Sequence, residues 1–451
     1  MKSPVSGANL RERLGRGIAW NLVGTLFNQG STLLVNLVVA NLLGRRAFGE
    51  YAILQGTLTT AAAIAQFATG YTATRYVAEY RSKNPETAGR ILGLCEIVSI
   101  VTALAAGMTL ALGAHWLTAD VLRTPGLAPE MTIAAAVVPW SVVSGYLMGA
   151  LAGLEAYPSL AKVGIVSGIV YSASGSLGAW AGGLRGVLVG LAASGMLQWF
   201  LLRGSVRRAA RRQRIPIRYV GVWREREVLT AFALPAALSG AISIAALWLA
   251  NAILARQPNG YEELAVYAAA NNIRLIVLFL PILVTSVGMA VMSNTMHEDD
   301  GTRYRRVFWT TAGLTVASVV AGAAVSVLAG SWVLGLFGKS FQTGTGVLGV
   351  LMIAAVAEAM FLSIYQVVQS RAVLWLSFFA IVLPREASMV VAAWFLAPSR
   401  GSLGLAEALT IGRVLSLVVV TVIVARIGLS GPPPRFAGRS AVGTATQAWP
   451  G

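Results

Sequence analysis

Residues 91–114 have the sequence ILGLCEIVSIVTALAAGMTLALGA, an apolar run that contains one charged side chain, Glu96. A helix needs about 20 apolar residues to cross roughly 30 Å of hydrocarbon. Comparable runs recur along the chain, each separated from the next by a short polar patch. They are too long for the roughly 10-residue alternation of a membrane barrel strand, and lipid admits only helices or closed barrels. The sequence therefore predicts an all-α integral membrane protein.

The composition agrees with this class, because 56% of the residues are hydrophobic and only 12% are charged. A soluble chain of 451 residues needs a larger charged fraction to cover its surface. We expect about twelve transmembrane helices. The predicted spans are 17–42, 50–74, 90–114, 131–153, 159–181, 185–203, 228–255, 265–292, 307–330, 345–369, 372–396 and 403–427.

The net charge of +17 is distributed unevenly between the two sides of these spans. Most Lys and Arg residues fall in the connections of one side, which the positive-inside rule assigns to the cytoplasm. We therefore expect a multi-pass protein of the inner (plasma) membrane with both termini cytoplasmic. Nucleic acid is not expected as a partner, because the rest of the chain lies in lipid. The opposite side holds Arg45, Arg46, Arg123, Arg185, Arg256, Lys339 and Arg400.

The densest run of positive charge extends from Arg203 to Arg226. One interpretation is a topology determinant that joins two halves of the protein and lies on anionic headgroups. The other is a landing surface for an anionic lipid substrate.

This basic run divides the predicted spans into two sets of six, and the halves align weakly at an offset of about 216 residues. Gly44 falls on Gly260, and Tyr51-Ala52 falls on Tyr267-Ala268. Because six is even, the repeat is parallel, and it predicts two six-helix lobes around a central cavity. The expected organisation is an N-terminal cytoplasmic segment (1–16), a first lobe (17–203), a basic linker (204–227), a second lobe (228–428) and a disordered cytoplasmic tail (429–451).

Ionisable residues inside the spans are candidates for function, because a lone charge in hydrocarbon costs roughly 2.5–3.5 kcal/mol. Arg274 lies near the middle of the eighth span, in the sequence Asn271-Asn272-Ile273-Arg274. Its guanidinium could face the cavity and bind phosphate or diphosphate in a bidentate manner. The alternative is a structural ion pair with a buried Glu. We select Arg274 and Asn271 as candidate substrate-binding residues.

Glu358 and Glu407 are the acidic candidates for an ion pair or for a proton or cation site. Arg385 and Glu386 are expected to pair locally. Arg413 is expected to reach another lobe element.

Amide side chains recur at intervals of seven or eight along the first span, at Asn21, Asn28 or Gln29, and Asn36. This spacing places them on one helix face, which either lines a wet cavity or holds helices together. Asn28 is the candidate substrate ligand of this stripe. Arg75, at the cytoplasmic end of the second span, is either a residue of the cavity mouth or an interfacial anchor.

No catalytic constellation, nucleotide-binding fingerprint or metal-ligand spacing is present in the sequence, so we expect neither an enzyme nor a cofactor. Cys95 is the single cysteine and excludes an internal disulfide framework.

Two segments carry a resemblance to a known family. The first is Asn41-Leu42-Leu43-Gly44-Arg45-Arg46-Ala47-Phe48-Gly49-Glu50-Tyr51-Ala52, and the second is Gly70-Tyr71-Thr72-Ala73-Thr74-Arg75-Tyr76-Val77-Ala78-Glu79-Tyr80. The chain resembles the multidrug/oligosaccharidyl-lipid/polysaccharide exporter superfamily, and within it the Wzx-type polysaccharide-biosynthesis branch.

The resemblance implies a V-shaped pair of lobes with a cationic cavity. It also implies a flippase that moves a polyprenyl-diphosphate-linked oligosaccharide from the cytoplasmic to the outer leaflet for cell-surface polysaccharide synthesis. Membrane lipids, a polysaccharide polymerase and glycosyltransferases are the implied partners. Arg274 matches a cavity arginine of the related lipid II flippases. Those proteins also have charges in the first span and two further helices, which this chain lacks, and this argues against lipid II as the substrate.

A cation-coupled multidrug antiporter of the same superfamily is the main alternative, which Glu358 and Glu407 keep open. A membrane glycosyltransferase or polymerase would be expected to have a long acidic outer loop, and the loop at about 115–130 holds only Asp120 and Glu130.

Overall fold

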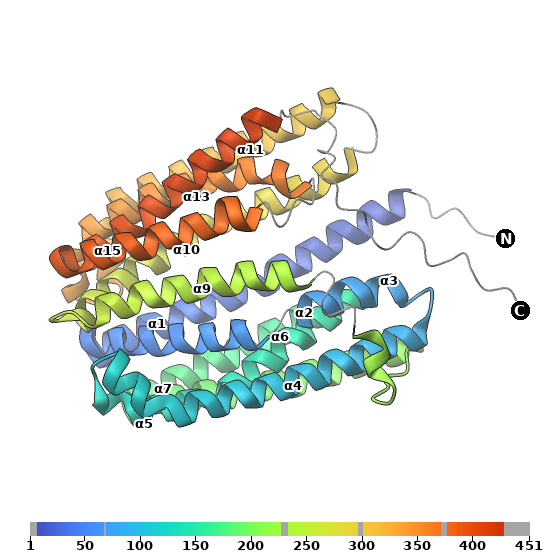
Figure 1. Ribbon diagram of the computed structural model, residues 1–451, viewed down its shortest axis with the longest axis horizontal. Coiled ribbons are helices and arrows are strands. Elements are labelled where there is room, and N and C mark those ends of the chain that lie inside the picture. Colours follow the sequence, from blue (N-terminus) through green and yellow to red (C-terminus); the bar gives the residue numbers. More distant parts are fainter. Residues whose placement is uncertain (1–6, 67–68, 227–232, 296–300, 371–376, 428–451) are drawn as a thin grey trace, which may run out of the picture.

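The computed structural model describes residues 7–66, 69–226, 233–295, 301–370 and 377–427, and these residues form helices and short connections (Figure 1). The predicted disordered tail (429–451) lies outside this range. The main helices are α1 (Gly7–Ala65), α2 (Thr69–Thr72), α3 (Ala78–Tyr80), α4 (Pro85–Trp116), α5 (Ala128–Ala135), α6 (Val138–Gly153), α7 (Tyr157–Arg212), α9 (Ala233–Ala255), α10 (Gly260–Thr295), α11 (Gly301–Leu328), α12 (Gly330–Gly335), α13 (Thr345–Ser370) and α15 (Leu383–Ile427). The π-helical turns include η1 (Ala73–Val77) and η6 (Phe378–Val382).

Eight of the described helical segments are long and apolar enough to cross a membrane. Three of them contain two passes each, because α1, α7 and α15 bend at Gly44, Gly183 and Gly401. These glycines have φ values of 82°, 57° and 56°, in the left-handed region that glycine adopts at no steric cost. The shorter apolar helix in α9 adds the last pass. The predicted all-α fold of twelve spans is confirmed.

Several helices extend beyond the predicted span limits. The first helix begins at Gly7 in place of residue 17, and α7 continues to Arg212 in place of residue 203. The first part of the predicted basic linker is therefore helical. Arg and Ala dominate this extension (Ser205-Val206-Arg207-Arg208-Ala209-Ala210-Arg211-Arg212), and both residue types favour helix strongly.

The last hairpin of each lobe has the same backbone geometry. Gly183 and Gly401 occupy one conformation, with ψ values of −141° and −131°. A Cβ atom on Gly186 would lie 2.0 Å from the carbonyl oxygen of Gly178, and one on Gly404 would lie 2.3 Å from that of Leu396. In both hairpins a glycine lets the returning helix contact the backbone of the preceding one.

The helices form two bundles (Figure 1). Helices α1 to α7 make the first lobe, and α9 to α15 make the second. The bundles lie close together at the end where α1, α7 and α15 bend, and they diverge toward the end where α1 begins and α15 finishes. We call these the closed end and the basic end, since the latter carries Arg203, Arg207, Arg208, Arg211 and Arg212.

Direct contacts join the lobes at the closed end. Asn41 Nδ2 donates to the Leu336 carbonyl over 2.7 Å, and Arg45 Nε donates to the Glu262 carbonyl over 3.0 Å. The Arg45 guanidinium also lies 3.4 Å from a Glu263 carboxylate oxygen. These contacts seal this end of the space between the lobes.

Apolar packing reinforces the seal. Phe48 of the first lobe is fully buried, and its ring centroid lies 5.9 Å from those of both Phe337 and Phe341. The backbones also approach closely here, because a Cβ atom on Gly49 would lie 1.8 Å from the carbonyl oxygen of Tyr261.

Candidate functional site

A cavity of about 440 Å³ lies between the lobes. The bent helix α1, the first half of α7, and helices α9 and α10 supply its walls. The polar side chains that line it are Thr32, Asn36, Tyr51, Gln55, Thr59, Tyr171, Asn251, Tyr267, Asn271 and Asn272. We call this space the central cavity. Among the described residues that line it, none carries a formal charge.

Hydrogen bonds between lining residues fix several of these side chains. Gln55 Nε2 donates to the Tyr51 hydroxyl over 2.7 Å and to the Tyr171 hydroxyl over 3.2 Å. Asn36 Nδ2 of α1 donates to Asn272 Oδ1 of α10 over 3.0 Å, which links the two lobes through the cavity wall.

Two polar atoms of the wall are buried and have no hydrogen-bond partner in the described part of the chain. They are Oδ1 of Asn251 and the hydroxyl of Tyr267. A buried polar group without a partner costs about 1–3 kcal/mol. A ligand that supplies hydroxyl groups would remove this cost.

A second cavity of about 370 Å³ adjoins the first and shares Gln55, Thr59 and Tyr171 with it. Gln66, Ser141, Ser194 and Gln198 line the remainder, which lies on the inner face of the first lobe. The described lining residues of this cavity also carry no formal charge. Together the two cavities present a polar, uncharged surface rich in amides and hydroxyls.

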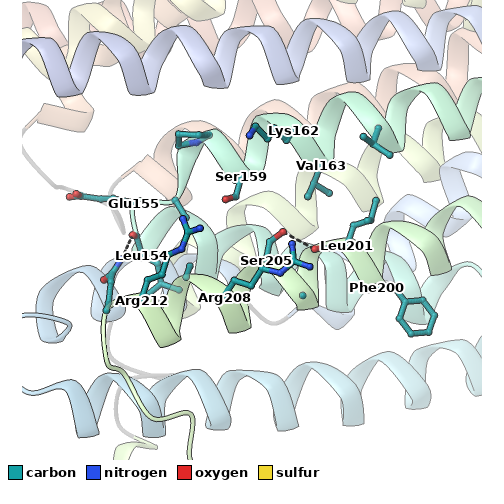
Figure 2. Close-up of a pocket in the computed structure, with 16 residues that line it drawn as sticks. Leu154, Glu155, Ser159, Lys162, Val163, Phe200, Leu201, Ser205, Arg208 and Arg212 are labelled. Atoms are coloured by element: carbon teal, nitrogen blue, oxygen red, sulfur yellow. Dashed lines mark hydrogen bonds between the residues drawn. The ribbon is translucent and has the colours of Figure 1, made fainter.

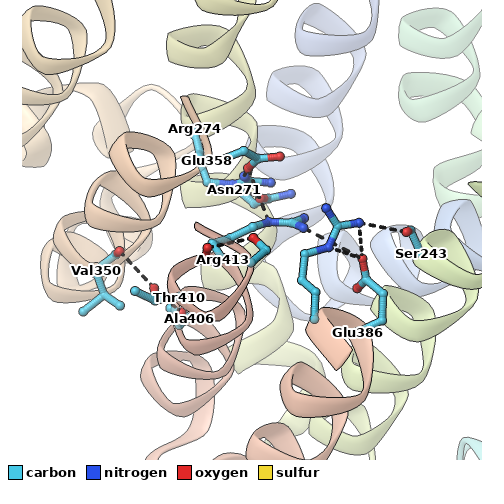
Figure 3. A network of polar contacts seen from close by, with 11 residues as sticks. Ser243, Asn271, Arg274, Val350, Glu358, Glu386, Ala406, Thr410 and Arg413 are labelled. Carbon is cyan, nitrogen blue, oxygen red and sulfur yellow. Dashed lines mark hydrogen bonds and ion pairs between the residues drawn. The ribbon is translucent and has the colours of Figure 1, made fainter. Parts of the chain in front are cut away.

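A cluster of intramembrane charges lies inside the second lobe, and none of its members lines either cavity (Figure 3). Arg274 of α10 forms an ion pair with Glu358 of α13, and its Nε donates to Asn271 Oδ1 over 2.8 Å. Arg413 Nε of α15 lies 3.4 Å from the same Glu358 carboxylate. Glu358 is 22% exposed and the two arginine side chains are 5% and 13% exposed, so the paired charges are largely buried.

A second pair extends the cluster. Arg385 Nε donates to Glu386 Oε1 over 2.7 Å, and Arg385 Nη2 donates to the Ser243 hydroxyl of α9 over 3.0 Å. Arg413 Nη1 lies 3.9 Å from Glu386 and connects the two pairs. We call Arg274, Arg385, Arg413, Glu358 and Glu386 the ionic cluster. Three guanidinium groups against two carboxylates leave one net positive charge when all are ionised.

The structure brings together only part of the set selected from the sequence. Asn271 lines the central cavity, and Arg274 lies one helical turn farther along α10, bonded to Asn271. Glu358 is the ion-pair partner of Arg274. This geometry corresponds to the alternative interpretation of Arg274, a structural ion pair with a Glu inside the membrane. Glu407 lies apart from them and pairs with Arg400 over 2.7 Å.

The two remaining candidates lie outside both cavities. Asn28 is exposed, and its carbonyl accepts a hydrogen bond of 3.0 Å from Thr32. Arg75 is exposed in η1, with its guanidinium 5.6 Å from the centre of the Tyr76 ring. Of the amide stripe on the first span, Asn36 lines the central cavity, and the side chain of Asn21 is outside the described residues.

Gln55, Asn251 and Tyr171 also line the central cavity, although they were not predicted from the sequence. The internal repeat could have indicated Gln55. At the same offset of about 216 residues, Tyr51 corresponds to Tyr267 and Gln55 corresponds to Asn271, and all four line the central cavity. The two lobes thus contribute equivalent positions to one site.

Solved structures share this architecture. A lipid II flippase MurJ in an inward closed conformation aligns with a TM-score of 0.73 at 13% identity, over 90% of this chain and 87% of that chain. An inward-facing multidrug resistance MATE family transporter of the MOP superfamily aligns at 0.69 with 15% identity, over 89% and 94%. A MOP superfamily transporter from Pyrococcus furiosus, described as having a binding pocket of reverse polarity, aligns at 0.68 with 15% identity, over 95% and 99%.

The fold and the inter-lobe cavity therefore define a multi-pass membrane protein with the two-lobe fold of MOP superfamily transporters. The family model of the polysaccharide biosynthesis proteins matches residues 14–296, more than half of the chain. The chain belongs to the polysaccharide biosynthesis protein family. No protein of curated function matches it.

Proposed function

We propose that this protein is a flippase that moves a polyprenyl-diphosphate-linked oligosaccharide from the cytoplasmic to the outer leaflet by alternating access, for cell-surface polysaccharide synthesis. Membership of the polysaccharide biosynthesis protein family and the fold of MOP superfamily transporters support this proposal. The observation that carries it is the uncharged, amide-rich and tyrosine-rich central cavity.

The chemistry of the cavity suits a sugar better than a cation. Glycans present many neutral hydroxyl groups, each of which can donate and accept, and amides and tyrosines offer both functions in return. Asn251 Oδ1 and the Tyr267 hydroxyl are already buried without partners. A cation antiporter would place a carboxylate on the wall, whereas Glu358 and Glu386 are held by arginines behind it.

The ionic cluster would act on the diphosphate from behind the wall. Its net positive charge lies one side chain away from the central cavity, because Arg274 bonds to Asn271. A unit charge roughly 8 Å from a phosphate contributes about 2 kcal/mol at an effective dielectric constant of about 20. In this proposal Asn271 contacts the substrate directly, and Arg274 orients Asn271 and supplies the field.

The remaining steps follow from the geometry of the lobes. The basic end would face the cytoplasm, as the positive-inside rule requires, with both termini on that side of the inner membrane. Arg75 would lie near the entrance, and the polyprenyl chain would stay in the bilayer beside the lobes. To release the glycan, the contacts of Arg45 with Glu262 and Glu263 must break while the basic end closes. A polymerase and glycosyltransferases would use or supply the substrate.

The deciding experiment is to measure the leaflet distribution of lipid-linked glycan in cells with and without this protein. We expect accumulation on the cytoplasmic face in its absence, and re-expression should relieve it. An unchanged distribution together with new sensitivity to cationic drugs would favour the multidrug antiporter instead.

A further inference from the structure

A basic pocket lies in the first lobe, apart from the central cavity (Figure 2). It has a volume of about 630 Å³ and lies between the N-terminal part of α7 and the C-terminal part of the same bent helix, at the basic end. Its cationic side chains are Lys162, Arg208 and Arg212. It shares no lining residue with the central cavity or the adjoining one.

The three cations are available for a ligand. Arg208 and Arg212 are four residues apart and therefore lie on one face of the helix, opposite Lys162 on the antiparallel segment. Within the part of the chain that the structure describes, none of the three forms an ion pair. The pocket has one acidic lining residue, Glu155, and Arg81 from outside the pocket pairs with it.

Other arginines of the basic run between Arg203 and Arg226 are already held in ion pairs. Arg203 is held by Glu96 over 3.2 Å, and Arg218 is held by Glu86 over 3.2 Å. Gln213 Nε2 donates to the Leu154 carbonyl over 2.7 Å, which ties the end of α7 to the connection before it. The run thus contains arginines that hold α7 and the linker to α4 and arginines that face a pocket.

The other part of the pocket is apolar and faces lipid. Val166 and Phe200 are 45% and 52% exposed on a membrane-spanning helix. Val166 is four residues from Lys162 and Phe200 is eight residues from Arg208, or about 6 Å and 12 Å along the helix axis. The pocket therefore combines a cationic region at the membrane surface with an apolar wall at acyl-chain depth.

We propose that this pocket binds an anionic phospholipid of the surrounding leaflet, with its phosphate between Lys162, Arg208 and Arg212 and an acyl chain against Val166 and Phe200. The occupant is a resident lipid rather than the transported one, because the pocket is separate from the cavities between the lobes. The lipid would anchor the end of the first lobe in the membrane. This inference does not depend on the proposed transport function.

The test uses the purified full chain in detergent and counts bound lipid by native mass spectrometry. Phosphatidylglycerol, phosphatidylcholine, a polyprenyl diphosphate and inorganic phosphate are titrated separately. We expect phosphatidylglycerol to bind at least about tenfold more tightly than phosphatidylcholine, since each surface cation contributes about fivefold. The K162Q/R208Q/R212Q variant should lose this preference.

The matched control is R207Q/R211Q/R214Q, which also removes three positive charges, from the end of α7 and the residues after it, without changing a lining residue. It should keep the preference for phosphatidylglycerol. Should the pocket variant fold poorly, a comparison of K162Q with R207Q makes the same test with one charge removed from each protein.

Equal losses of the preference for phosphatidylglycerol in variant and control, or no loss in either, would overturn the proposal. Tighter pocket-dependent binding of the polyprenyl diphosphate would also overturn it, because the pocket would then belong to the substrate route. If inorganic phosphate bound in the pocket as tightly as phosphatidylglycerol, the apolar wall would contribute nothing to binding, and the proposal of a lipid ligand would be wrong.

Discussion

Asn36 in α1 and Asn272 in α10 are 236 residues apart in the chain, and their side-chain amides form a hydrogen bond of 3.0 Å across the two lobes. Both residues line the central cavity. The same wall that would contact a substrate therefore also holds the lobes together. In a protein that works by alternating access, such a bond couples occupation of the cavity to separation of the lobes.

The first prediction concerns the ion pair of Arg274 with Glu358. R274A removes the orienting bond to Asn271 and brings the net charge of the ionic cluster to zero, so glycan export should be abolished while membrane insertion persists. Removal of one partner of a buried pair costs about 3–5 kcal/mol, so a lower Tm in detergent is also expected. E358Q raises the net charge and should keep export.

R400Q/E407Q serves as the control, because this pair lies outside the ionic cluster. Export at the normal rate by a well-inserted R274A protein would exclude the role proposed for Arg274.

The second prediction tests the amide wall. N251L removes a buried carbonyl oxygen that has no described partner, so the fold should not be weakened. If that oxygen accepts a bond from a glycan hydroxyl, transport should fall about tenfold, the effect of one hydrogen bond. The measurement is the rate of lipid-linked glycan translocation, with Q342L, an exposed amide at the closed end, as the comparison. Equal rates in the two variants would remove Asn251 from the site.

The third prediction concerns the seal at the closed end. A side chain at Gly49 cannot fit against the Tyr261 carbonyl, so G49V should keep the lobes apart there and stop transport. An introduced cysteine at Phe341, which is 1% exposed, should then react with an impermeant thiol reagent from the outer side. G30V is the matched control on the same helix, because its added side chain meets open space. Failure of the reagent to distinguish the two variants would contradict the assignment of this end.

The fourth prediction addresses the linker after α7. Tyr219 donates a hydrogen bond of 2.9 Å to Glu96, and partial burial together with this bond raises the pKa of Tyr219 above its ordinary value of 10.0. A raised pKa means that the contribution of Tyr219 to linker docking is complete below about pH 10 and is lost as the pH rises through the folded pKa. Limited proteolysis of the linker should accelerate above that pH. Y219F should show faster cleavage already at neutral pH and a weaker pH dependence; an unaltered profile in Y219F would show that another group controls docking.

Hydropathy alone located the membrane passes of this protein, because burial in lipid is a local property of each run of about 20 residues. The internal sequence repeat predicted the two lobes. In the structure, the bends at Gly183 and Gly401, one in each lobe, have the same backbone conformation. Arg274 and Asn271 also stood out in the sequence, since polar residues are conspicuous in an apolar span.

The tertiary structure decided which polar side chains face one another. The sequence alone does not determine that Arg274 pairs with Glu358 behind the wall while Gln55 and Asn251 line the cavity, because helix rotation depends on contacts between distant segments. Asn28 and Asn36 share a helix face by spacing, yet only Asn36 meets the opposite lobe, since the lobes diverge away from the closed end. Hydrophobic runs determined the helices, and the packing of one lobe against the other determined the site.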